Sequence, residues 1–274
     1  MPRHPILLPS ALALLLIAAL LAADAHAAGP APRLEADVRA NTLERAGKRS
    51  AALVRDDTLT DIARFHSRSM YEAGTLAHEL PDGVGPGDRL ARRHRTLFGL
   101  VSENVAFREG QPRGRSLAAR LVDGWMKSPG HRANILASYD TFEVGCFGDR
   151  ETMYCTQLFL RSSTRLADEV AFRQPAASEL TVELAGPAAK APPARRVSVA
   201  PVGAAGSDPG VALTGGAARL SVPERPGLYQ LKLWTAQEGD PTRYRVIGGP
   251  YICATGSVEP AADGAVDADC PGPD

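Results

Sequence analysis

The chain has 274 residues, with 31 basic and 31 acidic side chains and no net charge at neutral pH. This length indicates one large domain or two modest ones. The balanced charge gives no reason to expect a nucleic-acid partner or binding to an anionic membrane surface.

The first predicted element is a secretory signal peptide over residues 1–27. A weakly basic start is followed by an almost continuous apolar run over residues 6–23, and Ala25-His26-Ala27 is a small-x-small cleavage site. The mature chain then begins at Ala28 and is secreted or periplasmic. The alternative is an uncleaved anchor, because the apolar run is long enough to span a bilayer. No later segment could span a membrane, so we expect a soluble exported protein.

Residues 33–47 and 56–74 read as the first two helices, each with an apolar stripe at helical spacing. Asp56 or Asp57 can cap the second helix, and a glycine ends each one. His66 falls on the apolar face of the second helix, which favours a core histidine over a catalytic one. His78 follows that helix in a loop, from which it can turn into a cleft.

Residues 88–98 contain a run of basic residues, and we expect the solvated face of a short helix there. Next, Ser102-Glu103-Asn104 lies in a semi-apolar stretch. Glu103 is either a surface residue or a buried carboxylate held by hydrogen bonds, and the sequence does not show the partner that burial would need.

Two further helices are predicted over residues 116–125 and 129–136. Ser128 is a good N-cap residue and Pro129 suits the first helical position. His131 then lies in the first turn, where the positive end of the helix dipole favours a neutral imidazole. Such a ring can accept a proton or bind a metal. The alternative is that His131 only completes a helix start.

Four cysteines in an exported chain predict two disulfides. Residues 142–148 and 152–160 read as strands, and a two-residue turn at Arg150 and Glu151 places Cys146 opposite Cys155. Cys253 then pairs with Cys270 and ties down the tail. The alternative is four free thiols.

The pattern changes near residue 166, where glycine and proline become frequent and short alternating runs replace helical spacing. Such runs predict a small β-sandwich over residues 166–254, with a flexible loop at 184–195. Residues 255–274 read as an acidic tail, flexible apart from Cys270. Every histidine of the mature chain precedes residue 132, so histidine chemistry belongs to the first domain, residues 28–165.

Several motifs of that first domain occur in an order that resembles the CAP superfamily, also called the SCP-like extracellular domain, and its bacterial branch above all. These motifs are Asn41-x-x-Glu44-Arg45, Ala63-x-x-His66-Ser67-x-x-Met70 leading to His78, Ser102-Glu103-Asn104-Val105-Ala106, Trp125-Met126-x-Ser128-Pro129-Gly130-His131-Arg132-x-Asn134-Ile135-Leu136, Phe142-Glu143-x-Gly145 and Tyr154-x-Thr156-Gln157-x-Phe159.

The resemblance implies an α+β fold, a CAP-type α-β-α sandwich, followed here by the small all-β sandwich-like domain. It also implies a central cleft in which two histidines and two acidic residues meet. His78 and Glu103 match two of those positions. His131 lies near the place of the second acidic residue, and Tyr154 stands where the animal proteins have a histidine. The four-residue set is therefore only half kept, and we expect a cleft lined by His78, Glu103, His131 and Tyr154.

Three functions are compatible with this cleft. The first is a binding module for a cation, such as zinc or magnesium at His78 and His131, or for a small-molecule, lipid or glycan ligand. The second is a metal-assisted, peptidase-like hydrolase with Glu103 or a histidine as general base. The third is a structural envelope protein in which a buried His–carboxylate bond only holds the fold together.

Overall fold

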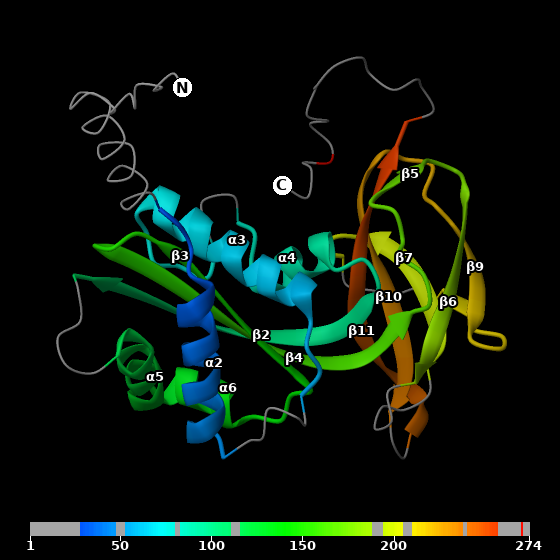
Figure 1. Ribbon diagram of the computed structural model, residues 1–274. Coiled ribbons are helices and arrows are strands. Elements are labelled where there is room, and N and C mark those ends of the chain that lie inside the picture. Colours follow the sequence, from blue (N-terminus) through cyan, green and yellow to red (C-terminus); the bar gives the residue numbers. More distant parts are fainter. Residues whose placement is uncertain are drawn as a thin grey trace, which may run out of the picture.

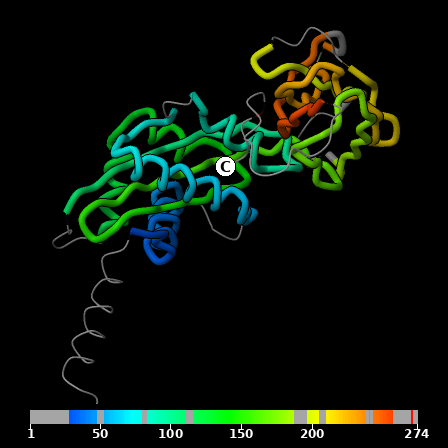
Figure 2. The backbone as a smooth tube through the Cα atoms, turned by 90° about the horizontal axis from the view of Figure 1, so that it is seen from above, coloured from blue at the N-terminus to red at the C-terminus, as the bar shows by residue number. Residues whose placement is uncertain are grey.

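The structure is a computed structural model that describes residues 28–47, 53–79, 83–110, 116–187, 194–204, 210–237, 240–256 and 270. The predicted signal peptide, residues 1–27, lies outside them, as does the predicted tail apart from residues 255, 256 and 270. An N-terminal region of helices and strands is followed by a C-terminal β region, residues 166–256, and the two lie side by side (Figures 1 and 2). No helix among the described residues is long and apolar enough to cross a membrane.

The helices of the N-terminal region begin and end close to the predicted positions. They are α2 (Pro32–Arg45), α3 (Asp57–Ala73), α4 (Pro86–Arg93), α5 (Leu117–Lys127) and α6 (Pro129–Leu136). The Asp56 side chain caps α3 by accepting the Leu59 N–H, as predicted. Ser128 is the N-cap residue of α6, as predicted, and its side chain makes no cap hydrogen bond. Pro129 still starts α6, since its ring fixes φ near the helical value.

The helices cover both faces of an antiparallel sheet built on β2 (Leu97–Glu109), β3 (Thr141–Gly148) and β4 (Thr152–Leu166), with β1 (Gly29–Pro30) at its edge. One apolar cluster joins α3 and α4 to one face of the sheet. A second cluster joins α2, α5 and α6 to the other face (Figure 1). The predicted α-β-α sandwich is therefore confirmed.

The β3–β4 hairpin has the predicted register. Cys146 pairs with Cys155, and their sulfurs form a disulfide. The turn closes through the Asp149 N–H, which donates to the Thr152 carbonyl over 2.8 Å. This bond leaves Arg150 and Glu151 as the two turn residues. Cys253 and Cys270 form the second disulfide, as predicted.

The C-terminal β region places two sheets face to face. Near the end of β4, β6 (Glu179–Pro187) and β9 (Ala217–Ser221) extend the first sheet. The second sheet has the order β5 (Arg173–Pro175), β11 (Asp240–Thr255), β10 (Gly227–Gln237), β7 (Ala194–Pro201) and β8 (Val211–Ala212). Apolar side chains of both sheets form one core. The predicted sheet-rich C-terminal region is confirmed.

The predicted loop over residues 184–195 is too long. β6 continues to Pro187 and β7 begins at Ala194, so strands occupy both ends of that range. Residues 188–193 lie outside the described residues. The sequence signal fails here because alanine, proline and glycine dominate both strand ends, and these residues have weak strand preferences.

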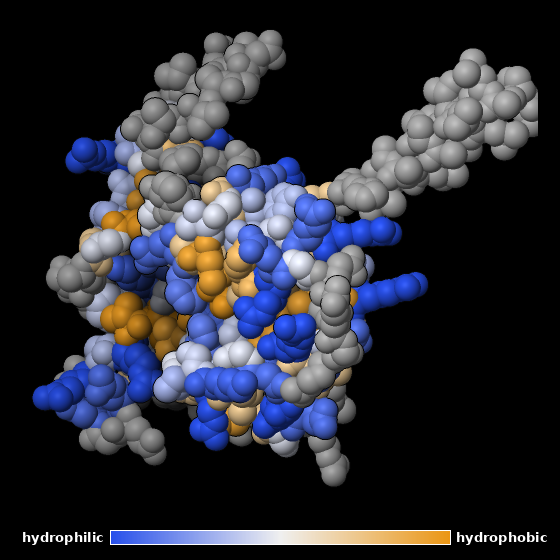
Figure 3. Space-filling view, turned by 90° about the vertical axis from the view of Figure 1, so that its left-hand side faces the viewer, coloured by the Kyte–Doolittle hydropathy of each residue, from blue (hydrophilic) through white to orange (hydrophobic). Residues whose placement is uncertain are grey.

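The two regions share buried residues. Phe98 of β2 has no exposed surface, yet it belongs to the apolar core of the C-terminal β region. Its ring lies so close to Gly249 of β11 that a Cβ there would come within 2.3 Å of it. The end of the molecule seen in Figure 3 is mostly hydrophilic, with hydrophobic patches between the charged side chains.

Candidate functional site

Glu103 projects from β2 toward α3 and is the buried centre of the candidate site. Only 1% of its side-chain surface is exposed. In a strand successive side chains point to opposite faces. Glu103 therefore shares a face with Val105, which packs against Met70 of α3. A buried carboxylate is costly unless cations or N–H donors replace its lost water. Of the two predicted alternatives, burial among hydrogen bonds is the one observed.

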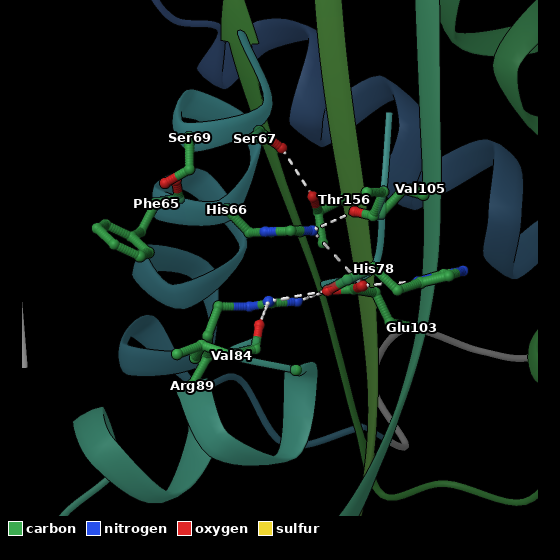
Figure 4. Close-up of polar contacts among 12 residues, drawn as sticks. Phe65, His66, Ser67, Ser69, His78, Val84, Arg89, Glu103, Val105 and Thr156 are labelled. Carbon is green, nitrogen blue, oxygen red and sulfur yellow. Dashed lines mark hydrogen bonds and ion pairs between the residues drawn. The ribbon is translucent and has the colours of Figure 1, made fainter. Parts of the chain in front are cut away.

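Each oxygen of Glu103 has a different partner. Oε2 accepts a hydrogen bond of 2.6 Å from Nη2 of Arg89, and the two residues form an ion pair. Oε1 lies 2.8 Å from Nδ1 of His78. Figure 4 shows Glu103 between the side chains of these two residues. Charge-assisted bonds of this length are about twice as strong as neutral ones.

Arg89 is 3% exposed and also donates to two backbone carbonyls. Its Nη1 lies 3.0 Å from the carbonyl of His78 and 2.7 Å from that of Val84. Arg89 therefore contacts both Glu103, which is the hydrogen-bond partner of His78, and the backbone carbonyl of His78.

The prediction of a solvated basic face over residues 88–98 is wrong for two of its members. Arg89 points inward to Glu103. His94, 5% exposed, lies 3.0 Å from Asp56 at the start of α3. A run of basic residues shows that the segment is charged but not which acidic residues it pairs with. Here both acidic partners, Glu103 and Asp56, are remote in sequence.

His66 forms one wall of the site and is the predicted core histidine. It has no exposed surface, and its Nε2 donates to the carbonyl of Ala77 over 2.8 Å. The same nitrogen lies 3.7 Å from Oε1 of Glu103. Burial lowers the pKa of His66 to about 4, so the ring is neutral at pH 7. The bond to Ala77 fixes the chain immediately before His78.

A close approach of α3 to the sheet makes this wall possible. A Cβ on Gly145 of β3 would lie 2.1 Å from the backbone nitrogen of Arg64, so only glycine fits there. Ser67 of α3 donates to the carbonyl of Gly145 over 2.8 Å. Together these contacts fix the distance between α3 and the sheet, and therefore the position of His66.

His78 is the accessible member of the site, with 51% of its side chain exposed. The hydrogen bond to Glu103 raises the pKa of His78, against an opposing effect of partial burial. Because Nδ1 donates to Glu103, Nε2 is the ring nitrogen that can meet a ligand. The arrangement resembles a base oriented by a carboxylate, which can bind an acceptor or transfer a proton.

His131 lies in the first turn of α6, as predicted, and is partly buried. Burial lowers its pKa, and the positive charge of His78 adds to that effect. The opposite shifts of His78 and His131 favour a protonated ring at His78 and a neutral ring at His131.

Asparagine side chains fix the position of α6 against β2. Nδ2 of Asn104 donates to the carbonyl of His131 over 3.1 Å. Nδ2 of Asn134 donates to the carbonyl of Glu103 over 3.2 Å. The backbone atoms of His131 and Glu103 are thus linked through the two amides, and this network explains why asparagines accompany the charged residues in the sequence.

Tyr154 lies on the same face of the sheet as Glu103 but further along it. Glu103 pairs with Leu158 of β4, four residues from Tyr154. The ring of Tyr154 packs at 4.8 Å from Phe107 and 6.3 Å from Tyr71. The hydrogen bonds at Glu103 do not involve Tyr154, and its membership of the cleft stays a prediction.

The side chains as arranged do not fit a metal ion coordinated by Glu103. Both oxygens of Glu103 are engaged, and the guanidinium of Arg89 lies where a cation would have to bind. Among the described residues, no group of three or more His, Cys, Asp and Glu side chains is placed to hold a metal. A cation site at His78 and His131 stays a prediction.

Comparison with known proteins finds a family model and several similar solved structures, among them two bacterial proteins. The model of the cysteine-rich secretory protein family, CAP, matches residues 38–159. An outer surface protein from Borrelia burgdorferi is 23% identical, with a TM-score of 0.39, over 47% of this chain and 94% of that one. An extracellular protein containing an SCP domain from Bacillus anthracis is 33% identical, with a TM-score of 0.31, over 40% of this chain and 33% of that one. No curated protein matches the sequence.

Proposed function

We propose that the chain, whose residues 38–159 match the model of the cysteine-rich secretory protein family, CAP, is an exported binding protein that holds its ligand at His78. The two disulfides support export, since structural disulfides persist in oxidising compartments. The proposal covers both a periplasmic and a secreted protein.

The observation that carries the proposal is the hydrogen bond between Nδ1 of His78 and Glu103. It fixes the ring before any ligand arrives, and it keeps the ring protonated to a higher pH than usual. A preorganised donor loses little entropy on binding. The ligand we infer is a small molecule, lipid or glycan with an acceptor or anionic group that meets Nε2 of His78.

A divalent cation is the second candidate, through His78 and His131 rather than through Glu103. Histidines that bind zinc usually donate their other ring N–H to a carboxylate, as His78 donates to Glu103. However, a catalytic zinc has three protein ligands, and this pair supplies two. We therefore expect cation binding to be weak, with no metal-assisted hydrolysis.

Hydrolysis without a metal would require His78 to act as general base for water or for a nucleophile. All four cysteines form disulfides, so the nucleophile would not be a thiol. We therefore propose ligand binding, rather than hydrolysis, as the function of the site.

Calorimetric titration of the exported protein tests the proposal. The probes are phosphatidylglycerol vesicles, peptidoglycan fragments, zinc chloride and magnesium chloride. We expect saturable binding of a lipid or glycan probe that His78→Ala removes. Glu72→Gln, an exposed change on α3, is the control and should retain that binding.

Two results would overturn the proposal. One is lipid or glycan binding that survives in folded His78→Ala. The other is tight binding of zinc alone, which would assign the site to a cation.

A further inference from the structure

The short helix α4 contacts both the His78 site and the C-terminal β region. Arg89 binds Glu103 on one side, as described above. On the other side the hydroxyl of Tyr251, on β11, donates to the carboxylate of Asp88. Asp88 and Arg89 are consecutive residues, so one turn of helix separates the two regions (Figure 1).

Asp88 connects Tyr251 to the start of α4. One of its oxygens accepts the Gly85 N–H over 3.0 Å and closes the first turn of the helix, while the other accepts from Tyr251. Burial, together with the bond to Asp88, raises the pKa of Tyr251 well above its usual range. The hydroxyl therefore stays protonated, and a donor, at neutral pH.

The opposite end of this connection is the site itself. Arg89 holds Glu103 through Oε2 and the loop through the carbonyl of His78. A shift of α4 would thus move the carboxylate that orients the His78 ring and the backbone that carries it.

The packing around α4 is not continuous. A cavity of about 520 Å³ borders it at Arg92 and Arg93, and another of about 300 Å³ borders it at Gly87 and Asp88. With open space on two sides, α4 is held by the packing of Leu90 in its apolar cluster and by a few specific polar contacts. The Tyr251–Asp88 bond is such a contact.

We propose that Tyr251 is a positioning residue for the His78 site: through Asp88 and Arg89 of α4, the C-terminal β region sets the geometry of the His78–Glu103 pair. The assignment of a ligand to His78 rests on the proposed function. The mechanical link from Tyr251 to His78 does not, and it can be tested without a ligand. In this arrangement a partner bound to the C-terminal β region would alter the ligand site across the domain junction.

The test compares two tyrosine variants of the full exported chain. Tyr251→Phe removes the bond to Asp88. Tyr229→Phe is the matched control, because it removes a buried hydroxyl that donates to the carbonyl of Arg225, away from α4. The readout is the pH midpoint of the His78 ring signals, followed by NMR.

The direction of the expected change follows from the charges around His78. Those that act on its pKa are Glu103, Arg89 and Glu79. The hydrogen bond to Glu103 is the strongest of these influences and raises the pKa of His78, so a displaced carboxylate should lower the midpoint. We expect a downward shift in Tyr251→Phe and none in Tyr229→Phe.

An unchanged His78 midpoint in folded Tyr251→Phe would overturn the inference, as would an equal shift in Tyr229→Phe. If Tyr251→Phe does not fold, Asp88→Asn weakens the same bond at nearly constant size and must show the same downward shift. If the protein binds none of the probes but Tyr251→Phe shifts the His78 midpoint, only the proposed function is refuted. If the protein binds a probe at His78 but Tyr251→Phe leaves the midpoint unchanged, only this inference is refuted.

Discussion

A carboxylate with 1% of its side chain exposed is stable only where other groups replace its water, and Glu103 has a guanidinium on one oxygen and an imidazole on the other. The same contacts that make its burial tolerable also orient His78. Structural stability and the presentation of a ligand group are therefore not separable at this residue.

Replacing Glu103 by glutamine should change both properties. Glu103→Gln leaves Arg89 buried beside an uncharged partner, and breaking a buried pair in this way costs about 3–5 kcal/mol. The pKa of His78 should fall, because burial and the charge of Arg89 lower it and the weaker influence of Glu79 alone remains to raise it. Denaturant unfolding and NMR titration measure the two effects. A His78 pKa that stays raised in the variant would contradict this account of the pair.

The two histidines next to Glu103 should give opposite pH dependences of stability. The pKa of His78 is raised on folding, so its contribution is present below its unfolded value of 6.5 and is lost as the pH rises through the folded pKa. The pKa of His66 is lowered to about 4, so the unfolded state takes up its proton first as the pH falls below 6.5. His66 therefore costs stability between pH 6.5 and 4, on the order of a few kcal/mol.

His66→Gln tests this acid sensitivity. The variant should lose less stability than the wild type between pH 7 and pH 5, whatever its stability at pH 7. Urea unfolding at both pH values gives the comparison. An equal loss in the two proteins would show that His66 does not titrate on unfolding.

At the scale of elements, the fit of α3 against β3 depends on Gly145. Gly145→Ala would place a methyl group 2.1 Å from the nitrogen of Arg64 and push α3 away from the sheet. Overpacking of this kind costs typically about 1–3 kcal/mol. Because α3 carries His66 and leads to His78, the His78 midpoint should move as well.

The matched control is Gly130→Ala in α6, where a Cβ would meet nothing within 4 Å. It should be neutral or stabilising by up to about 1 kcal/mol, since alanine favours a helix. Thermal melts of both variants make the comparison, and equal destabilisation would refute the role of the close approach.

Most elements of the N-terminal region could be predicted because their signals are local. The stripe of α3 follows from residue spacing, and the register of Cys146 and Cys155 follows from the length of the turn. The inward orientation of Arg89 could not be predicted in this way. Nothing within α4 distinguishes Arg89 from the partly exposed Arg92 and Arg93, and the carboxylate that draws it inward lies 14 residues away on β2.

The candidate site shows the same limit. The order of the motifs predicts that His78, Glu103 and His131 line one cleft. Of the contacts this implies, the hydrogen bond between His78 and Glu103 is observed. The sequence could not show that Arg89 takes the second oxygen, which changes the chemistry from metal ligation to hydrogen bonding. It also could not separate Tyr154 from Glu103, because both lie on one face of the sheet and only the strand register gives their spacing.

At the scale of the whole molecule, the two regions are joined by a shared sheet and a shared core. β4 pairs with β3 and β2 in the first region and with β6 in the second. Phe98 of β2 is buried in the second core. Such continuity predicts a single cooperative unfolding transition.

Phe98→Ala should weaken this junction. The loss of a buried phenylalanine costs about 3–5 kcal/mol. Because the cavity lies on the C-terminal side of β2, that region should unfold first and split the calorimetric transition in two. A single transition at the wild-type temperature would contradict the shared core.

The central claim is that the ligand meets Nε2 of His78 while Nδ1 stays bonded to Glu103. The most direct test is NMR of the imidazole nitrogens during titration with the lipid or glycan probe that binds. We expect the Nε2 signal of His78 to move with saturation while its Nδ1–H proton stays protected. Saturation with no change at His78, or with loss of the Nδ1–H bond, would contradict it.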